Sequence, residues 1–273
     1  MINVVDRVST YPGRVKLTRA DGTIEYVTWE RADEPTVPGT PINKALFDSI
    51  KADIGLSANI TLYVSKSGSD TLGNGTSANP YLTIMKAVAS LPKNLNGFDA
   101  TINIAAGSYG EDVEISRFTG GSVILTGETG AGVAIRSLRV SYGSIVQVQY
   151  IVLDVTRSIN DNAIAVTNAS LICINTVNIT GSVVTGLYVN RYGYAMFATL
   201  AIKSTSDAAI HATNASTVFI AAVQVTSTTG TGIRSTNGSL VSYNTVALST
   251  ATSFNTASGG RIYTGAQAST PNY

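Results

Sequence analysis

The sequence predicts an all-β protein built as a right-handed parallel β-helix, and three features of the chain lead to this prediction. First, a segment of 23 residues recurs, with copies beginning at Ala163, Gly186, Ala209 and Gly232. Second, apolar residues within each copy alternate with polar or small ones, as in a strand with one buried face. Third, Asn, Gly and Ser residues divide each copy into about three short strands. Such copies stack as successive coils of one helix.

The aligned copies contain columns of apolar residues, which we expect to fill the inside of the coils. The columns are Leu138, Ile164, Leu187, Ile210, Ile233 and Phe254; Val146, Ile172, Ala195, Val218, Val241 and Ile262; Val148, Ile174, Phe197, Ile220 and Tyr243; Ile151, Val177, Leu200, Val223 and Val246; and Leu153, Ile179, Ile202, Val225 and Leu248. Like charges stacked one strand spacing apart, roughly 4.8 Å, would repel, which fits the low charged fraction of 13%. A β-sandwich of unrelated strands would not explain the constant step.

The segment before the coils, residues 59–106, is expected to begin the β-helix. It contains a strand at 62–65, a loop rich in Gly, Asn and Ser, and a helix from about Pro80 to Leu91. Asn79 is placed to cap this helix, which would shield the open edge of the first coil. With the run "AAGSYGEDVEI", the segment resembles the start of pectate-lyase-like β-helices. The coils themselves then occupy residues 107–273.

Residues 1–58 differ in kind from the rest of the chain. They predict a hairpin with its turn at residues 20–22, a Pro-containing linker, and a short amphipathic helix within residues 42–54. The apolar stripe of this helix contains Ile42, Leu46 and Ile50. A unit this small buries little core of its own, so we expect it to dock on another protein.

Two separated stretches of this segment carry a family resemblance. "NVVDRVSTYPGRVKLT" and "RADEPTVPGTPINKALFDSI" resemble the N-terminal part of tail-fibre and baseplate-associated proteins of phages, and of phage-tail-like particles, in Gram-positive bacteria. The resemblance implies a virion structural protein, commonly a homotrimer, that is made in the bacterial cytoplasm and released by lysis. It also implies that residues 1–58, with Ile42, Leu46 and Ile50, attach the chain to other virion or tail-particle proteins.

Composition argues against several other classes of function. Lys and Arg (18) nearly balance Asp and Glu (17), and no basic patch is present to bind nucleic acid. No window approaches the roughly 18 uninterrupted apolar residues of a membrane helix, so membrane insertion is not expected. Cys173 is the sole cysteine, which excludes a disulfide within the chain. The start "MINVVDR" lacks the features of a secretory signal, which weakens the alternative of a secreted bacterial adhesin.

The sequence offers few residues for catalysis. Glycoside hydrolysis uses a pair of carboxylates, yet from Ser137 onward the only acids are Asp154, Asp161 and Asp207. Asp112 and Glu114 would face one side of a strand, about 7 Å apart, as an ordinary solvated pair. We therefore expect no enzyme, no metal and no cofactor. The alternative is a polysaccharide-degrading tailspike, a glycoside hydrolase or lyase whose acids come together across chain boundaries.

One outward column is a candidate for binding cell-surface polysaccharide. Its members are Arg139, Ala165, Tyr188, His211, Arg234 and Asn255, with Arg191, Tyr192 and Tyr194 expected in the loop beside it. Aromatic faces pack on sugar rings while polar groups bond their hydroxyls. The alternative is that these are ordinary surface residues.

A second outward column is a candidate interface between three copies of the chain. It contains Gln147, Cys173, Met196, Phe219 and Ser242. Cys173, Met196 and Phe219 would form an exposed apolar strip on a monomer, and such strips mark interfaces. The alternative is that the inward and outward phase is reversed locally. Taken with what the family resemblance implies, the repeats and this column predict a rigid trimeric shaft of a virion, with host glycan as a candidate ligand.

Overall fold

The structure is a computed structural model that describes residues 14–18, 24–28, 55–129, 132–153 and 159–264. The chain divides into two compact units, residues 1–54 and 55–273. In the first, β1 (Arg14–Thr18) pairs antiparallel with β2 (Ile24–Thr28), which confirms the expected hairpin. The expected turn, linker and amphipathic helix of this unit lie outside the described residues, as do Ile42, Leu46 and Ile50.

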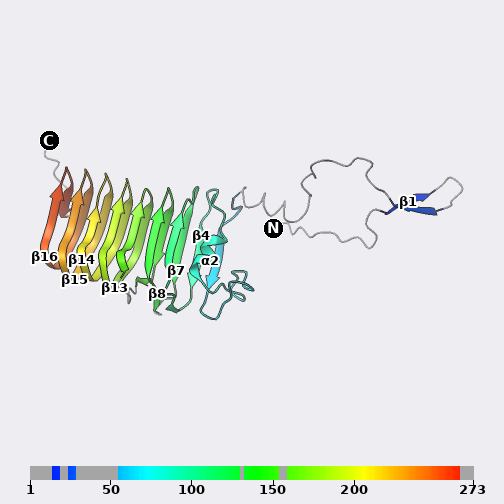
Figure 1. Cartoon of the computed structure of the whole chain (residues 1–273), viewed down its shortest axis with the longest axis horizontal. Coiled ribbons are helices and arrows are strands. Elements are labelled where there is room, and N and C mark those ends of the chain that lie inside the picture. The colour runs from blue at the N-terminus through cyan, green and yellow to red at the C-terminus, as the bar shows by residue number, and fades with distance from the viewer. Residues whose placement is uncertain (1–13, 19–23, 29–54, 130–131, 154–158, 265–273) are drawn as a thin grey trace. The chain divides into compact units, whose positions relative to one another are not determined.

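The second unit is a parallel β-helix, as the repeats predicted (Figure 1). Its strands are β3 (Ile60–Val64), β4 (Ala100–Ile104), β5 (Gly107–Ser108), β6 (Asp112–Ser116), β7 (Ser122–Gly127), β8 (Val133–Ile135), β9 (Ser137–Ser141), β10 (Ile145–Gln149), β11 (Val152–Leu153), β12 (Ile159–Thr167), β13 (Ser170–Asn190), β14 (Tyr194–Ala212), β15 (Thr217–Thr236), β16 (Leu240–Ala257) and β17 (Arg261–Thr264). Along one side they follow the order β3-β4-β7-β10-β13-β14-β15-β16-β17. Every pairing in this sheet is parallel, so each coil adds strands to those of the coil before it.

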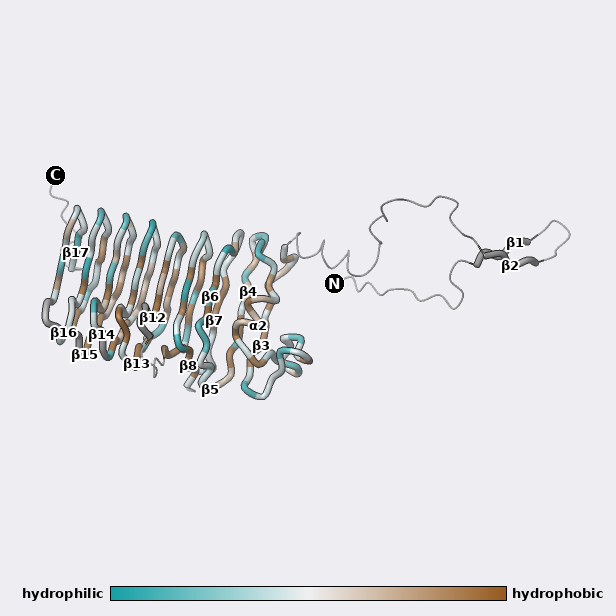
Figure 2. The backbone as a smooth tube through the Cα atoms, in the orientation of Figure 1, coloured by the Kyte–Doolittle hydropathy of each residue, from teal (hydrophilic) through white to brown (hydrophobic). Residues whose placement is uncertain are grey.

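The register of the strands confirms most of the expected apolar columns. Ile164 pairs with both Leu138 and Leu187, and the column continues through Ile210 and Ile233, all of them buried. The column ends at Phe254, which is 43% exposed, because β17 pairs with the first part of β16 and not with the part that holds Phe254. Figure 2 shows the apolar stretches recurring from coil to coil. The inside of the coils is therefore one continuous hydrophobic core.

Two columns were assigned wrongly in the coil that begins at Ala163. Leu171 and Cys173 occupy the inward positions that the constant repeat gave to Ile172 and Ile174. The register against β14 shifts between Cys173 and Thr176, where β13 carries one extra residue. Such a bulge turns the side chains before it to the opposite face. Ile174 is consequently 49% exposed, while Cys173 is buried.

The helix near the start of the β-helix is shorter than the sequence predicted. α2 spans Ile84–Ala89, and its N-cap is Thr83, whose side chain accepts a hydrogen bond from Lys86 N–H, rather than Asn79. The residues before it stay extended because Tyr81 pairs with β3, its N–H donating to the Tyr63 carbonyl at 2.9 Å. α2 buries Ile84 and its next turn against the first coils, at the β3 and β4 end of the unit (Figure 1).

The later coils turn a corner on pairs of residues with positive φ. Asn214 and Ala215 form one such pair, and the equivalent pairs are 191–192, 237–238 and 258–259. Asparagine tolerates this conformation, and its side chain also links the coils. Asn214 donates to Asn190 at 2.8 Å, and Asn237 donates to Asn214 at 3.1 Å. The turn residues seen in the sequence thus form a hydrogen-bonded ladder.

Candidate interaction surfaces

One side of the β-helix carries no charged side chain over eight adjacent strands of the described part of the chain. The outward residues of β3, β4, β7, β10 and the first part of β13 to β16 alternate with buried ones; they are Thr61, Tyr63, Thr101, Asn103, Ser122, Ile124, Thr126, Ile145, Gln147, Gln149, Ser170, Ile172, Ile174, Tyr194, Met196, Ala198, Thr217, Phe219, Ala221, Leu240, Ser242 and Asn244. We call this the uncharged face. The first charged residue in the row is Arg261, on β17.

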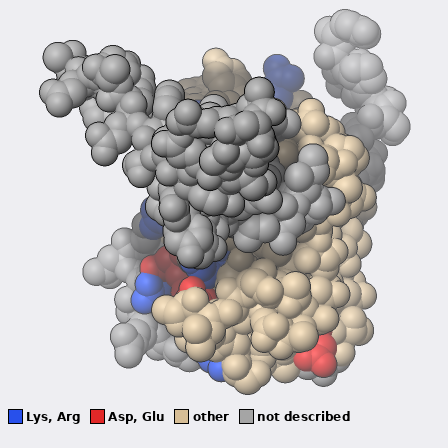
Figure 3. All heavy atoms as spheres, turned by 90° about the vertical axis from the view of Figure 1, so that its right-hand side faces the viewer, with Lys and Arg blue, Asp and Glu red and all other residues tan. Residues whose placement is uncertain are grey.

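Stacking alone does not explain the absence of charge on this face. Another outward column of the same β-helix runs Glu114, Arg139, Ala165, Tyr188, His211 and Arg234. The oppositely charged Glu114 and Arg139 are neighbours there, and Arg234 follows after three residues without a formal charge, so the fold accommodates charge where like charges are kept apart. Figure 3 shows acidic and basic groups side by side on another part of the surface. The absence of charged residues is therefore specific to this face and is not imposed by the β-helix fold.

The middle of the uncharged face is apolar and hollowed. Ile145, Ile174, Met196 and Phe219 are each between 39% and 49% exposed. A groove of about 410 Å³ runs between the side chains of β13 to β16 and is lined by Met196, Phe219 and their neighbours. Tyr194 lies beside these residues, with its ring centre 6.0 Å from that of Phe219. These side chains form the candidate interface.

Two of the residues that the sequence assigned to surfaces lie elsewhere. Cys173 was expected on the apolar strip but is 2% exposed and points inward, because the bulge in β13 shifts the register before it. Burial raises the pKa of its thiol well above the ordinary value. Tyr194 was expected beside the polar column but lies on the uncharged face, since β14 begins after the corner. Gln147, Met196, Phe219 and Ser242 share one row, as predicted.

The structure brings the polar column together in the predicted register. Tyr188 pairs with His211, whose ring it meets edge-on with 5.4 Å between ring centres. Arg234, the next residue along, forms an ion pair with Asp207 at 2.9 Å and donates to Thr231 at 3.3 Å. Arg139 and Asn255 continue the column and are exposed. The row is thus an aromatic ring, an imidazole and a fixed guanidinium side by side.

The surroundings of the imidazole in this row favour its neutral form. Burial lowers the pKa of His211, and the neighbouring Arg234 lowers it further against a smaller opposing effect of Asp207. Its Nε2 lies 3.5 Å from the Thr236 hydroxyl. A neutral imidazole both donates and accepts hydrogen bonds, which suits an uncharged ligand. At the adjacent corner, Arg191 is exposed and the Tyr192 side chain is 78% exposed.

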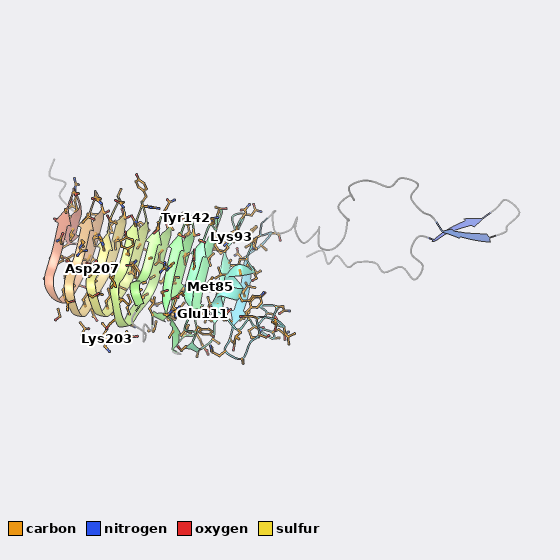
Figure 4. All side chains as sticks on the ribbon, in the orientation of Figure 1. Met85, Lys93, Glu111, Tyr142, Lys203 and Asp207 are labelled. Carbon is orange, nitrogen blue, oxygen red and sulfur yellow. The ribbon has the colours of Figure 1, made fainter. Side chains whose placement is uncertain are left out.

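Two acids of the first coils, Asp112 and Glu111, are engaged in structural contacts. Arg136 forms a bidentate ion pair with Asp112, and the Ser137 hydroxyl donates to the same carboxylate at 2.7 Å. The Arg136 hydrogen bond lowers the pKa of Asp112, so this carboxyl is a poor general acid. Glu111, which the sequence reading did not single out, accepts from Ile84 and Met85 N–H at 3.1 and 3.0 Å (Figure 4).

The described residues lack two features that would have indicated other functions. They contain no group of three or more His, Cys, Asp or Glu side chains placed to hold a metal ion. They also contain no helix with the length and apolar character needed to cross a membrane. A comparison of the chain with protein families, curated proteins and solved structures gave no match.

A second hollow, which the sequence reading missed, lies near the start of the β-helix. It measures about 680 Å³ and is lined by residues of β3, β4 and β7 together with the loop that follows β3. The signal in the sequence was weak, because Tyr63, Asn103 and Thr126 come from strands that precede the regular repeats.

Proposed function

We propose that the protein is a non-enzymatic structural component of a phage virion or phage-tail-like particle, in which three chains form a rigid β-helical shaft. Residues 1–58 attach the shaft to other particle proteins, and the particle is released by lysis. The N-terminal sequence motifs support this assignment, and a parallel β-helix is compatible with it. Stiffness follows from the fold, because each coil is hydrogen-bonded to the next through parallel strand pairs.

The proposal of a trimer rests on the uncharged face. A contiguous exposed apolar patch on a monomer is uncommon, and the centre of an interface is depleted of charged residues. Near a threefold axis each residue also meets its own copies, so a charge there would repel two identical charges. Four exposed large apolar side chains and no charge over eight strands fit such a position.

We further propose that the shaft contacts host cell-surface polysaccharide through the polar column. Tyr188, His211 and Arg234 combine an aromatic surface with hydrogen-bonding groups, the combination that suits sugars. Arg139 extends the row, and Arg191 and Tyr192 stand at the nearby corner; this set is therefore the candidate glycan contact. The column lies before the corner in each coil and the uncharged face after it, so the two surfaces do not compete.

Measurement of mass in solution tests the trimer. The intact chain should have three times the mass of one chain at micromolar concentration, and Phe219→Asp should convert it to monomers by placing a charge in the interface. Gln224→Asp is the matched control, because Gln224 is exposed on a different outward column of the same strand and should stay trimeric. A monomeric wild-type protein would refute the proposed assembly.

Incubation of the chain with cell-wall polysaccharides of Gram-positive bacteria tests the absence of catalysis. Retention of the polysaccharide without new reducing ends or unsaturated products is expected. Cleavage products would instead support the polysaccharide-degrading alternative. Antibody labelling of purified particles in the electron microscope then tests the location, with label expected on particles and not on free host protein.

A further inference from the structure

The hollow near the start of the β-helix has one wall made of a row of side chains from three neighbouring strands. Tyr63 of β3 pairs in register with Asn103 of β4, which pairs with Thr126 of β7. Their neighbours along each strand are buried, so these three side chains point outward. Residues in such a row are roughly 4.8 Å apart. The wall therefore presents an aromatic ring, an amide and a hydroxyl in line.

The opposite wall is the loop between β3 and α2, and this loop is fixed by its own hydrogen bonds. Tyr63 N–H donates to the Gly75 carbonyl and Ser65 N–H to the Tyr81 carbonyl, each at 2.9 Å. The Asp70 carboxylate accepts from the hydroxyl and N–H of Thr83 and from Leu82 N–H. Gly75 has φ +79°, and a Cβ there would lie 2.6 Å from the Tyr81 ring. The hollow is thus formed before any ligand arrives, which lowers the entropy cost of binding.

The chemistry of the lining suits an uncharged, hydroxyl-rich ligand. Besides the row, it offers the hydroxyls of Ser65, Ser67, Ser77 and Thr129 and the apolar surfaces of Ala78 and Pro80. The volume, about 680 Å³, lies within the range of small-molecule sites, roughly 300–1,000 Å³. Aromatic and apolar surfaces pack against the C–H groups of a sugar ring, while amides and hydroxyls bond its hydroxyls.

The electrostatics of the lining argue against an anionic ligand. Among the described residues that line the hollow, Glu128 is the one charged side chain. Its Oε2 accepts from Ala106 N–H at 3.0 Å, which holds the carboxylate in place. Lys66, in the same loop, holds its ammonium over the Tyr109 ring, 5.1 Å from the ring centre. A phosphate or uronic acid would meet a carboxylate here without a cation in the lining to offset it.

We propose that this hollow binds a short neutral saccharide. Tyr63 supplies the stacking surface, and Asn103 and Thr126 bond the hydroxyls of the sugar. This site is separate from the polar column. Tyr63, Asn103 and Thr126 lie on the first strands of the uncharged face, whereas the proposed trimer contact centres on the apolar middle of that face, on β10 and β13 to β15, so the proposal requires that the trimer leaves the first strands open. Mass in solution tests the trimer and saccharide binding tests this site, so failure of one is distinguishable from failure of the other.

The test is ligand-observed NMR, followed by calorimetry, on the full chain. The probes are neutral trisaccharides of glucose, galactose, mannose and N-acetylglucosamine, with a trigalacturonate as the anionic comparison. At least one neutral probe should bind and the trigalacturonate should not. Tyr63→Ala should weaken the binding at least tenfold, whereas Tyr63→Phe, which keeps the ring, should stay within about threefold. Tyr142→Ala is the control, since this tyrosine lies at an exposed corner (Figure 4).

Several outcomes would overturn the proposal. Binding of none of the neutral probes would do so, as would equal binding of the trigalacturonate. Binding that is lost in Tyr188→Ala but kept in Tyr63→Ala would place the sugar on the polar column instead. Pull-down of a particle protein that is lost in Tyr63→Ala, without any binding of sugar, would identify the hollow as a protein docking site. Circular dichroism of each variant checks that the β-helix is intact, and Tyr63→Phe covers the case in which Tyr63→Ala does not fold.

Discussion

The first coils and the later coils of this β-helix are held together in different ways. In residues 55–153 the strands are short, down to the two residues of β11, and individual side chains join distant segments. Lys93 donates to the Ser116 carbonyl at 2.9 Å and lies over the Phe118 ring, and Glu111 reaches α2. In residues 159–264 the strands run almost without interruption, as in the 21 residues of β13, and closely similar strand pairings recur from coil to coil.

This difference shows what repetition contributes. In a repeated contact such as the asparagine ladder, equivalent hydrogen bonds join successive coils, so the loss of one bond leaves the others in place. A single contact such as that of Glu111 has no second copy. We expect the later coils to depend on burial and the first coils to depend on particular polar groups. The four predictions below test that contrast.

The largest effect is expected from a core residue of the later coils. Phe197 is 1% exposed and pairs with Ile220 above it. Phe197→Ala removes a large buried ring and leaves a cavity, which should lower the free energy of unfolding by about 3–5 kcal/mol. Urea denaturation followed by circular dichroism measures the loss.

The matched control for this change is an exposed aromatic residue nearby. Tyr192 is 78% exposed, so Tyr192→Ala should change the free energy of unfolding by less than about 0.5 kcal/mol. Equal losses in the two variants would contradict the inward and outward assignment of this coil.

The first coils should respond instead to loss of a single carboxylate. Glu111→Ala leaves Ile84 and Met85 N–H without their acceptor at the start of α2. A lost helix cap of this kind should lower the free energy of unfolding by about 1–2 kcal/mol. Glu111→Gln keeps one acceptor oxygen and should lose less. If Glu111→Ala had no effect in thermal denaturation, the first coils would not depend on this contact.

A third variant should make the later coils more regular and more stable. Ala215 has φ 59°, whereas the equivalent positions of the two following corners hold Gly238 and Gly259 at φ 73° and 77°. Ala215→Gly removes the steric cost of the left-handed conformation but adds freedom to the unfolded chain. The net gain should be about 0.5–1 kcal/mol, seen as a rise in Tm. A fall in Tm would show that the alanine methyl group makes a contact of greater value.

The contrast between the two regions also explains what could be predicted from the sequence. The pairing of Tyr188 with His211, and of His211 with Arg234, follows from the 23-residue step alone. Such strand registers can be predicted because a single alignment of the repeats gives the pairing in every coil. The inward columns were predicted for the same reason, and they position the outward ones.

The features that could not be predicted each occur once in the chain and do not follow from the repeat. The bulge in β13 reverses Cys173 and Ile174, yet both residues are apolar, so the sequence favours neither orientation. The start of α2 is set by contacts from Asp70 and Glu111, which lie far from it in the chain. The hollow beside Tyr63 was missed because its residues meet only after the first coils have folded. The local sequence pattern contains no information about such contacts between distant segments.

The smallest effect, a change in stability with pH, tests whether the polar column is packed or merely exposed. The chain has one histidine, so His211 is the side chain whose ordinary pKa lies between pH 5 and 8. Burial, with Arg234 beside it, lowers its pKa in the folded state, so the unfolded chain takes up the proton more readily. Its contribution to stability is therefore present above pH 6.5 and is lost as the pH falls below that value. Urea denaturation at pH 7.5 and 5.5 should show a loss for the wild type that is smaller for His211→Gln. An equal loss in the two proteins would mean that the imidazole is solvated, and that the later coils pack only on their inner side.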